Sequence, residues 1–138
     1  MIVLSFDFGT KNIGVAIGQN ITYTANMLNN IKVKNGIPDW KKISYIIKLW
    51  LPQAIIVGYP LNMDGTRQNI TKKTIIFSKE LHQRYLMPVI LHDERLTTTE
   101  SKSILYNSGG YKKLKKKYID SLSAALILES WMQQNHSN

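Results

Sequence analysis

Three of the nine acidic residues stand where a carboxylate could carry out chemistry. Asp7 and Glu94 each follow a short apolar run, and Asp120 lies in the first turn of a predicted C-terminal helix. A carboxylate at the end of a buried strand is costly unless a cation, a donor or a metal compensates its charge. Three carboxylates in one place would also repel each other, which raises their pKa values unless cations bind.

Oxygen ligands without His or Cys favour Mg²⁺ or Mn²⁺. Mg²⁺ is usually held by one or two carboxylates together with substrate phosphates. Two such ions about 4 Å apart could activate a water molecule and stabilise the leaving oxygen of a phosphodiester. If folding brings Asp7, Glu94 and Asp120 together, the sequence predicts a metal-dependent hydrolase of phosphodiester bonds.

Each acid also has a purely structural explanation. Asp7 could cap a hairpin turn by accepting hydrogen bonds from backbone N–H groups. Glu94 could be an exposed acid paired with Arg95, a pair that contributes little stability. Asp120 could be a helix N-terminal acid favoured by the helix dipole, which is compatible with catalysis. For Asp93, capping of the following turn explains the residue as well as metal binding does.

Apolar runs and turn residues predict the elements that must position these acids. The first two strands are joined by a tight Gly/Asn turn, as in a β-hairpin. Residues 29–37 are polar and are expected to form a loop, and Trp40, Trp50 and Trp131 are expected in the core. In chain order we predict strands at 2–6, 13–18 and 21–28, a helix at 38–51, a strand at 54–58, a helix at 71–85, a strand at 88–91 and helices at 97–106 and 118–134.

This order predicts an α/β fold in a single domain of residues 1–138. The first three strands should be antiparallel, and the last two, each reached across a helix, should be parallel to the strand before them. The result is a mixed five-stranded sheet with helices on both faces. Ligand sites gather at the carboxyl ends of parallel strands, where Asp7 and Glu94 fall. A last helix packed across that end would add Asp120.

The composition is strongly basic, with 18 Lys and Arg against nine Asp and Glu and a net charge of +9. Such a domain is a candidate for binding nucleic acid, although a genome bias toward lysine and asparagine explains part of the charge. The absence of cysteine excludes disulfides and thiolate metal sites and fits a reducing compartment. Neither a membrane span nor a signal peptide is predicted, so we expect a cytoplasmic protein.

Several further residues are candidates for substrate contact. Lys11 and Arg95 are predicted to contact phosphate, although Arg95 could instead orient a carboxylate. The loop of residues 59–66 is expected either to shape the substrate groove or only to connect a strand to a helix. His92 could act as a base, but a histidine at a strand end is more often structural. A basic segment beside a Gly-Gly pair could close on a nucleic-acid backbone or be a solvated loop; its lysines are Lys112, Lys113, Lys115, Lys116 and Lys117.

Four segments resemble motifs of one known family: DFGTKNIGVA at 7–16, IVGYPLNMDG at 56–65, DERLTT at 93–98 and DSLSA at 120–124. They resemble the YqgF/RuvX family of bacterial ribonuclease H-like proteins, in the family's order and over nearly the whole chain. That family is described both as Holliday junction resolvases and as nucleases that mature the 5′ end of 16S ribosomal RNA. The resemblance implies a ribonuclease H-like fold, with Asp7, Glu94 and Asp120 as metal-binding catalytic carboxylates.

We therefore predict an endonuclease that uses Mg²⁺ or Mn²⁺, with two ions expected. From the resemblance, the preferred substrate is precursor ribosomal RNA, free or in pre-ribosomal particles. The alternatives are a Holliday junction resolvase acting on branched DNA and a nucleic-acid-binding module that does not cleave. The actin and sugar-kinase group also carries Asp-x-Gly-Thr in a hairpin, but its members bind nucleotide between two such domains. A monomer and a homodimer are both compatible with the sequence.

Overall fold

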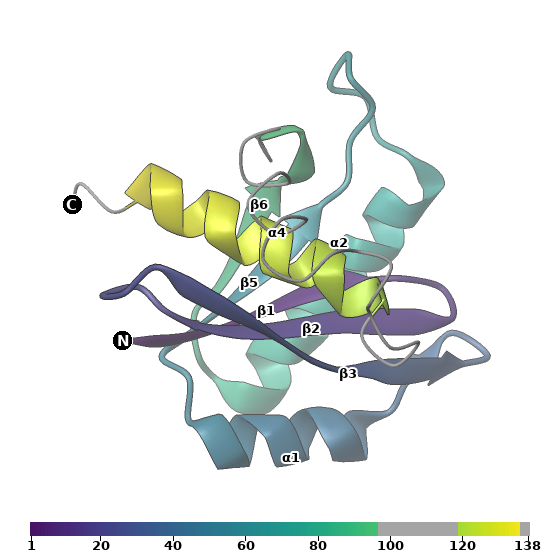
Figure 1. Ribbon diagram of the computed structural model, residues 1–138. Coiled ribbons are helices and arrows are strands. Elements are labelled where there is room, and N and C mark those ends of the chain that lie inside the picture. The colour runs from purple at the N-terminus through teal and green to yellow at the C-terminus, as the bar shows by residue number, and fades with distance from the viewer. Residues whose placement is uncertain (97–118, 136–138) are drawn as a thin grey trace.

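The computed structural model describes residues 1–96 and 119–135 and is built around one sheet (Figure 1). The helix predicted at 97–106 and the lysine-rich segment lie outside the described residues. The described elements are β1 (Ile2–Phe8), β2 (Asn12–Gln19), β3 (Thr24–Lys34), β4 (Ile37–Pro38), α1 (Trp40–Trp50), β5 (Ala54–Tyr59), α2 (Asn69–Tyr85), β6 (Val89–Asp93), the short 3₁₀ helix η1 (Glu94–Leu96) and α4 (Ile119–Asn135).

The strand order is β4-β3-β2-β1-β5-β6. β2 pairs antiparallel with both β1 and β3, whereas β5 pairs parallel with both β1 and β6. The predicted mixed sheet, with three antiparallel strands followed by two parallel ones, is therefore confirmed. Each parallel strand is reached across a helix, and β1, β5 and β6 end at the same edge of the sheet.

The predicted loop at residues 29–37 is wrong, and the sheet has six strands rather than five. β3 continues to Lys34 because Ile31 and Val33 are buried while the lysines between and after them are exposed. The chain then turns back into β4 through Asn35 and Gly36, which both have positive φ angles, of 52° and 76°. Asn-Gly in a two-residue hairpin loop is the sequence signature of this type of turn.

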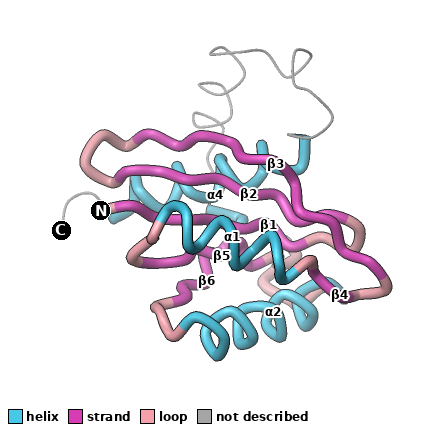
Figure 2. Tube along the Cα trace, turned by 90° about the horizontal axis from the view of Figure 1, so that it is seen from below, coloured by secondary structure: helices cyan, strands magenta, loops and turns pink. Residues whose placement is uncertain are grey.

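Helices cover both faces of the sheet (Figure 2). One core lies beneath α1 and α2, where residues such as Ile43 and Leu81 pack on Phe6 and its neighbours. The other lies beneath α4, whose Ala124, Ala125, Ile127, Leu128 and Met132 pack on Val3, Ala16 and Ile56. Among the described helices, none is long and apolar enough to cross a membrane.

The three tryptophans do not all lie in the core. Trp40 packs against the core beneath α1 and α2, and Trp131 packs against the core beneath α4. Trp50 is 36% exposed, so its predicted core position is wrong. It ends α1, after which Leu51 takes a left-handed backbone conformation and the chain runs into β5.

Candidate active site

Asp7 lies on the face of β1 that α4 covers. Side chains alternate along a strand, so Asp7 shares its face with Val3 and Ser5. Val3 belongs to the core beneath α4, and the Ser5 hydroxyl donates to the Ala124 carbonyl oxygen at 2.8 Å. The first turns of α4 therefore pack over the carboxyl end of β1 and bring Asp120 to the same edge of the sheet.

The charges of the three predicted carboxylates interact. Burial raises the pKa of Asp7 to about 6; a hydrogen bond from Ser123 opposes this rise, and the charge of Asp120 adds a smaller contribution to it. Burial also raises the pKa of Glu94 to about 7, and the charges of Asp7 and Asp93 add to this effect. Asp7 thus interacts with both Asp120 and Glu94, which are 26 residues apart in the sequence.

The buried charge of Asp7 should make the metal-free protein less stable as the pH rises. The folded state holds the Asp7 proton more tightly than the unfolded state, so stability falls from about pH 4 to pH 6 and the full cost persists above that range. Asp7→Asn removes this cost, about 3 kcal/mol, or roughly 10 °C in Tm at pH 8. In EDTA, the Tm advantage of Asp7→Asn should be small at pH 4 and large at pH 8.

Glu94→Gln should follow the same pattern, with its advantage growing until about pH 7. Thermal denaturation of the variants and the wild type across this range measures both effects, and comparison at each pH cancels the other titrating groups. A Tm difference between variant and wild type that does not change with pH would show that neither carboxylate is ionised in a buried position.

The carboxylates approach one another without forming a closed metal cage. Within residues 1–96 and 119–135, no group of three His, Cys, Asp or Glu side chains is close enough to hold a metal ion. The donor set nonetheless suits a hard cation, because all its ligating atoms are carboxylate oxygens. Burial and repulsion make the ionised forms of Asp7 and Glu94 costly, and a divalent cation bound between them would compensate that charge.

A bulge in β3 holds Asp120 in place. Val15 pairs with Leu28 and Ile13 with Ile31, so Asn29 and Asn30 both lie opposite the single residue Gly14. The Asn30 side-chain amide donates to Asp120 Oδ2 at 3.0 Å. Bulges often re-aim a side chain next to an active site, and this one turns Asn30 toward α4.

Ser121 replaces the strand pairing that the bulge removes. Its hydroxyl accepts a hydrogen bond from the Val15 N–H at 3.0 Å and lies 2.6 Å from the Leu28 carbonyl oxygen, to which it can donate. The Asn30 Oδ1 atom is a second acceptor for the same hydroxyl at 3.1 Å. Because this contact occupies the Asn30 oxygen, its amide nitrogen faces the Asp120 carboxylate.

Contacts of the residues around Glu94 bear on the structural alternatives given by the sequence. Arg95 pairs with Asp93 rather than Glu94, at 2.7 Å, and its backbone N–H also donates to Asp93 Oδ1 at 2.9 Å. Asp93 therefore caps the turn, and the surface ion pair suggested for Glu94 is absent. His92 is buried and hydrogen-bonds Ser130 at 2.9 Å, which supports its structural explanation.

The remaining predicted substrate contacts are Lys11, the loop at residues 59–66 and the lysine-rich segment. Lys11 is exposed in the turn between β1 and β2. The loop at residues 59–66 contacts Arg95, whose Nη1 donates to the Met63 carbonyl oxygen at 3.3 Å. Lys112, Lys113, Lys115, Lys116 and Lys117 lie outside the described residues.

Comparison with known proteins places the chain in a family. Residues 1–134 match the RuvX family model, described as Holliday junction resolvase. The chain belongs to the RuvX family. A protein of Wigglesworthia glossinidia brevipalpis named pre-16S rRNA nuclease is 57% identical over 131 residues, 95% of this chain and 91% of that one. A protein of the same name from Haemophilus ducreyi is 53% identical over 133 residues, 96% of each chain.

The fold of this RuvX-family protein is similar to that of solved Holliday junction resolvases. T. thermophilus RuvC in complex with Holliday junction substrate aligns with a TM-score of 0.61 and 14% identity, over 97% of this chain and 96% of that one. The fowlpox virus Holliday junction resolvase aligns with a TM-score of 0.54 and 17% identity, over 97% and 99%. These similarities confirm the predicted ribonuclease H-like fold.

The sequence of this RuvX-family chain does not mark Asn30, Ser121 and Ser123 as parts of the site. Ser121 and Ser123 fall inside the DSLSA motif, but the motif by itself does not indicate which hydrogen bonds their hydroxyl groups make. Asn30 lies 90 residues before its partner Asp120, in a segment interpreted as a loop. Its only sequence signal is the polar pair Asn29–Asn30 between apolar stretches, which is too common to indicate a bulge.

Proposed function

We propose that this RuvX-family protein is a metal-dependent endonuclease that hydrolyses phosphodiester bonds in the 5′-end maturation of pre-16S ribosomal RNA. The observation that carries the proposal is the set of interacting carboxylates Asp7, Glu94 and Asp120 at the carboxyl edge of the parallel strands. The names of its relatives, more than 50% identical over nearly the whole chain, favour ribosomal RNA as the substrate. We place its activity in the cytoplasm, as a monomer or a homodimer.

The three carboxylates would hold Mg²⁺ or Mn²⁺. Bound there, such ions supply an activated water and stabilise the leaving oxygen. Asp7 interacts electrostatically with both other acids, so it is the central member of the set that would hold the ions. Asn30 fixes the direction of the Asp120 carboxylate, and Ser123 donates to Asp7. Cation binding would lower the pKa values that burial raises to about 6 for Asp7 and about 7 for Glu94, and so keep both carboxylates ionised.

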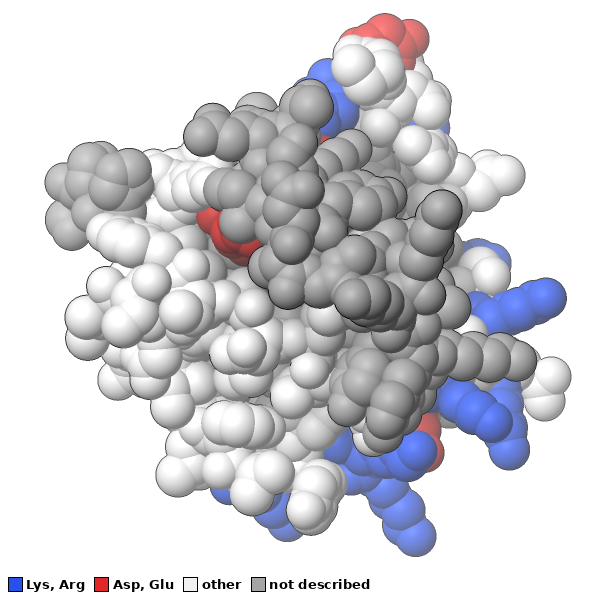
Figure 3. Space-filling model, in the orientation of Figure 1, with Lys and Arg blue, Asp and Glu red and all other residues white. Residues whose placement is uncertain are grey.

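Basic side chains supply the attraction for a nucleic-acid backbone. Figure 3 shows Lys and Arg side chains gathered on the side of the molecule that carries the β1–β2 turn and the end of β3. Lys11, Lys32 and Lys34 are exposed in this region. Arg95 keeps N–H groups for a phosphate besides those that contact Asp93 and Met63. We include Lys11, Arg95 and the lysines at 112, 113, 115 and 116 in the substrate-binding surface.

Loss of the Asn30 amide donor should weaken metal binding. Asn30→Asp replaces the donor to Asp120 with a second negative charge of nearly the same shape, so the Asp120 carboxylate is no longer oriented. We expect about a tenfold increase in the Mn²⁺ concentration needed for half-maximal cleavage. Asn29→Asp is the matched control, because it adds the same charge to an exposed position of the same bulge. Equal effects of the two variants would contradict an orienting role.

Holliday junction cleavage is the second candidate, favoured by the description of the family model. The deciding experiment incubates the wild-type protein with a labelled precursor of 16S ribosomal RNA or a labelled four-way DNA junction, in Mg²⁺, Mn²⁺ or EDTA. We expect metal-dependent cleavage of the RNA precursor near the mature 5′ end. Cleavage of the junction alone would establish the second candidate. Tight binding of both substrates without cleavage in either metal would refute the nuclease and establish a binding module.

A further inference from the structure

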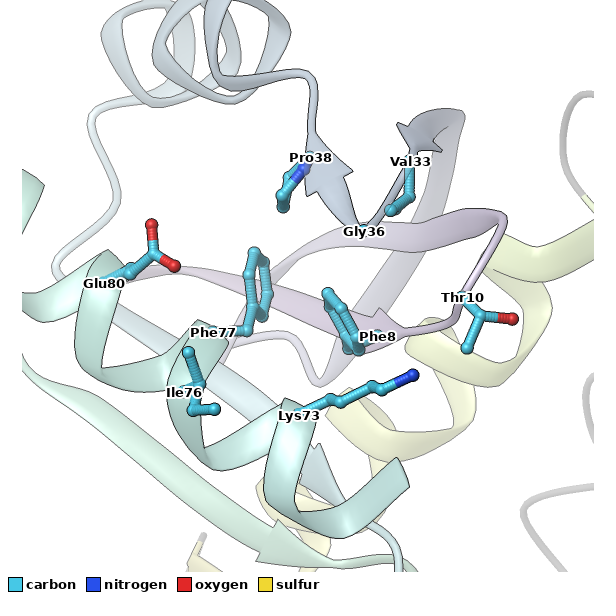
Figure 4. A pocket seen from close by; sticks show the side chains of 9 residues that line it. All are labelled: Phe8, Thr10, Val33, Gly36, Pro38, Lys73, Ile76, Phe77 and Glu80. Carbon is cyan, nitrogen blue, oxygen red and sulfur yellow. The ribbon is translucent and has the colours of Figure 1, made fainter. Parts of the chain in front are cut away.

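We propose that a pocket beside the end of β1 binds an unpaired nucleobase of the nucleic acid on which the protein acts. The pocket has a volume of about 290 Å³ and lies between the β1–β2 turn, the β3–β4 hairpin and α2 (Figure 4). It is separate from the carboxylates, which lie on the other face of the sheet. The inference deepens the proposed function, since it names how the substrate is held next to the carboxylates.

Aromatic rings form one wall of the pocket. Phe8 is half-buried and Phe77 is buried, with ring centroids 4.9 Å apart and planes inclined by 36°. Trp40 packs behind Phe77, at 5.8 Å between centroids, so the wall is supported from within the core. Val33 and Pro38 lie opposite in Figure 4. Aromatic rings of this kind bind unpaired bases by stacking. They accept any base, because every base has a π face.

Two charged side chains stand at different ends of this apolar pocket. Lys73, Ile76, Phe77 and Glu80 share one face of α2, since they are spaced at three, four and seven residues. Figure 4 shows Lys73 extending toward Thr10, whereas Glu80 lies at the far end. The ammonium group suits a phosphate at the mouth, and the carboxylate can accept a hydrogen bond from an exocyclic base amine.

The charges of the pocket favour a nucleotide over an apolar protein segment. An apolar protein segment would cover Lys73 and Glu80 without offering either of them a partner of its own, which is costly. Glu80 is held in place by a weak contact with Arg84, at 3.8 Å. The protein as a whole carries a net charge of +9, which attracts polyanions.

The pocket lies close to the proposed catalytic carboxylates, because Phe8, which lines it, is the residue next to Asp7 in β1. Phe8 directly follows Asp7, and because side chains alternate along a strand the two point to opposite faces at the same edge of the sheet. A strand of nucleic acid whose base entered the pocket would pass its backbone over the β1–β2 turn, where Thr10 and Lys11 are exposed. A base held there would fix which phosphate reaches the carboxylates.

The test follows backbone amide signals of the full-length ¹⁵N-labelled protein in EDTA. Adenosine 5′-monophosphate is titrated in parallel with ribose 5-phosphate, which carries the same phosphate but no base. We expect the nucleotide, and not the sugar phosphate, to shift the signals of Thr10, Gly36 and Phe77. Equal shifts with both compounds, or shifts confined to residues away from the pocket, would overturn the proposal.

Matched variants separate stacking from general effects on the fold. Phe8→Leu keeps an apolar side chain but removes the ring, and we expect about tenfold weaker nucleotide binding. Tyr45→Leu, an exposed aromatic residue of α1, should leave binding unchanged. Lys73→Ala should weaken binding more than Lys79→Ala, which removes the same charge outside the pocket. Unchanged binding by Phe8→Leu, with its spectrum still that of a folded protein, would exclude a stacking site.

The titration needs neither metal nor cleavage, so its outcome is independent of the nuclease assay. Nucleotide binding at these residues by a protein that cuts no substrate would refute the proposed nuclease but keep the pocket. Cleavage by a protein whose pocket signals do not respond to the nucleotide would keep the nuclease and refute the pocket.

Discussion

Asp7→Asn should reduce cleavage by about 10³-fold or more while binding of nucleic acid is retained. The substitution keeps the size of the side chain but removes the negative charge that would hold a divalent cation. Loss of metal assistance costs several kcal/mol of transition-state stabilisation, which corresponds to a rate loss of that size. Binding should persist because attraction of the backbone comes from lysine and arginine side chains elsewhere on the surface. Single-turnover cleavage and a binding titration in the same buffer measure the two effects separately.

Asp39→Asn is the matched control for this substitution. Asp39 caps α1, with its side chain accepting a hydrogen bond from the Lys42 N–H at 3.4 Å, and Asn is an equally good cap. We expect wild-type cleavage and wild-type stability from the control. A cleavage rate of Asp7→Asn within tenfold of wild type would rule out Asp7 as an essential carboxylate. Parallel loss of binding and cleavage would point to a substrate contact instead of a metal ligand.

Chain topology explains why two of the three carboxylates could be placed from sequence. Asp7 lies near the end of β1 and Glu94 directly follows β6. The crossover rule makes both strands parallel to β5 between them, so both acids fall at one edge of the sheet whatever the details of packing. Asp120 required a further assumption, that the last helix packs across this edge. In the structure α4 packs across this edge, because small residues at 123–125 let it approach the sheet closely.

The contacts that orient the carboxylates could not be predicted in the same way. Asn30 lies in a stretch whose polar residues hide the alternation of buried and exposed positions that β3 continues through Ile31 and Val33. Its role depends on a bulge and on a partner 90 residues away, and neither has a local sequence signal. The pocket beside Phe8 was missed for a related reason, because its walls come from three elements that only the fold brings together.

Close packing of α4 on β2 leads to the second large effect, which concerns stability. Gly14→Ala should destabilise the protein by about 3 kcal/mol and lower the Tm by roughly 10 °C. A Cβ atom at Gly14 would overlap the Asp120 carbonyl oxygen and come within 2.6 Å of its carbonyl carbon and 3.1 Å of Ser121 Cα. All three are backbone atoms of the first turn of α4, so no side-chain rotation can relieve the overlap. The helix must move away from β2, which breaks the hydrogen bond from the Val15 N–H to Ser121 and shifts Asp120.

Cleavage should therefore fall together with stability in Gly14→Ala, even at temperatures where the variant is folded. Gly36→Asn is the control: its Cβ would meet no atom within 4 Å, and Asn tolerates the positive φ of 76° at this position. We expect the Tm of this control to stay within about 2 °C of wild type. Thermal denaturation and cleavage below the lower Tm give both quantities for each variant. A Gly14→Ala protein with wild-type Tm and activity would mean that α4 does not press on β2 at this point, and the proposed placement of Asp120 would fail with it.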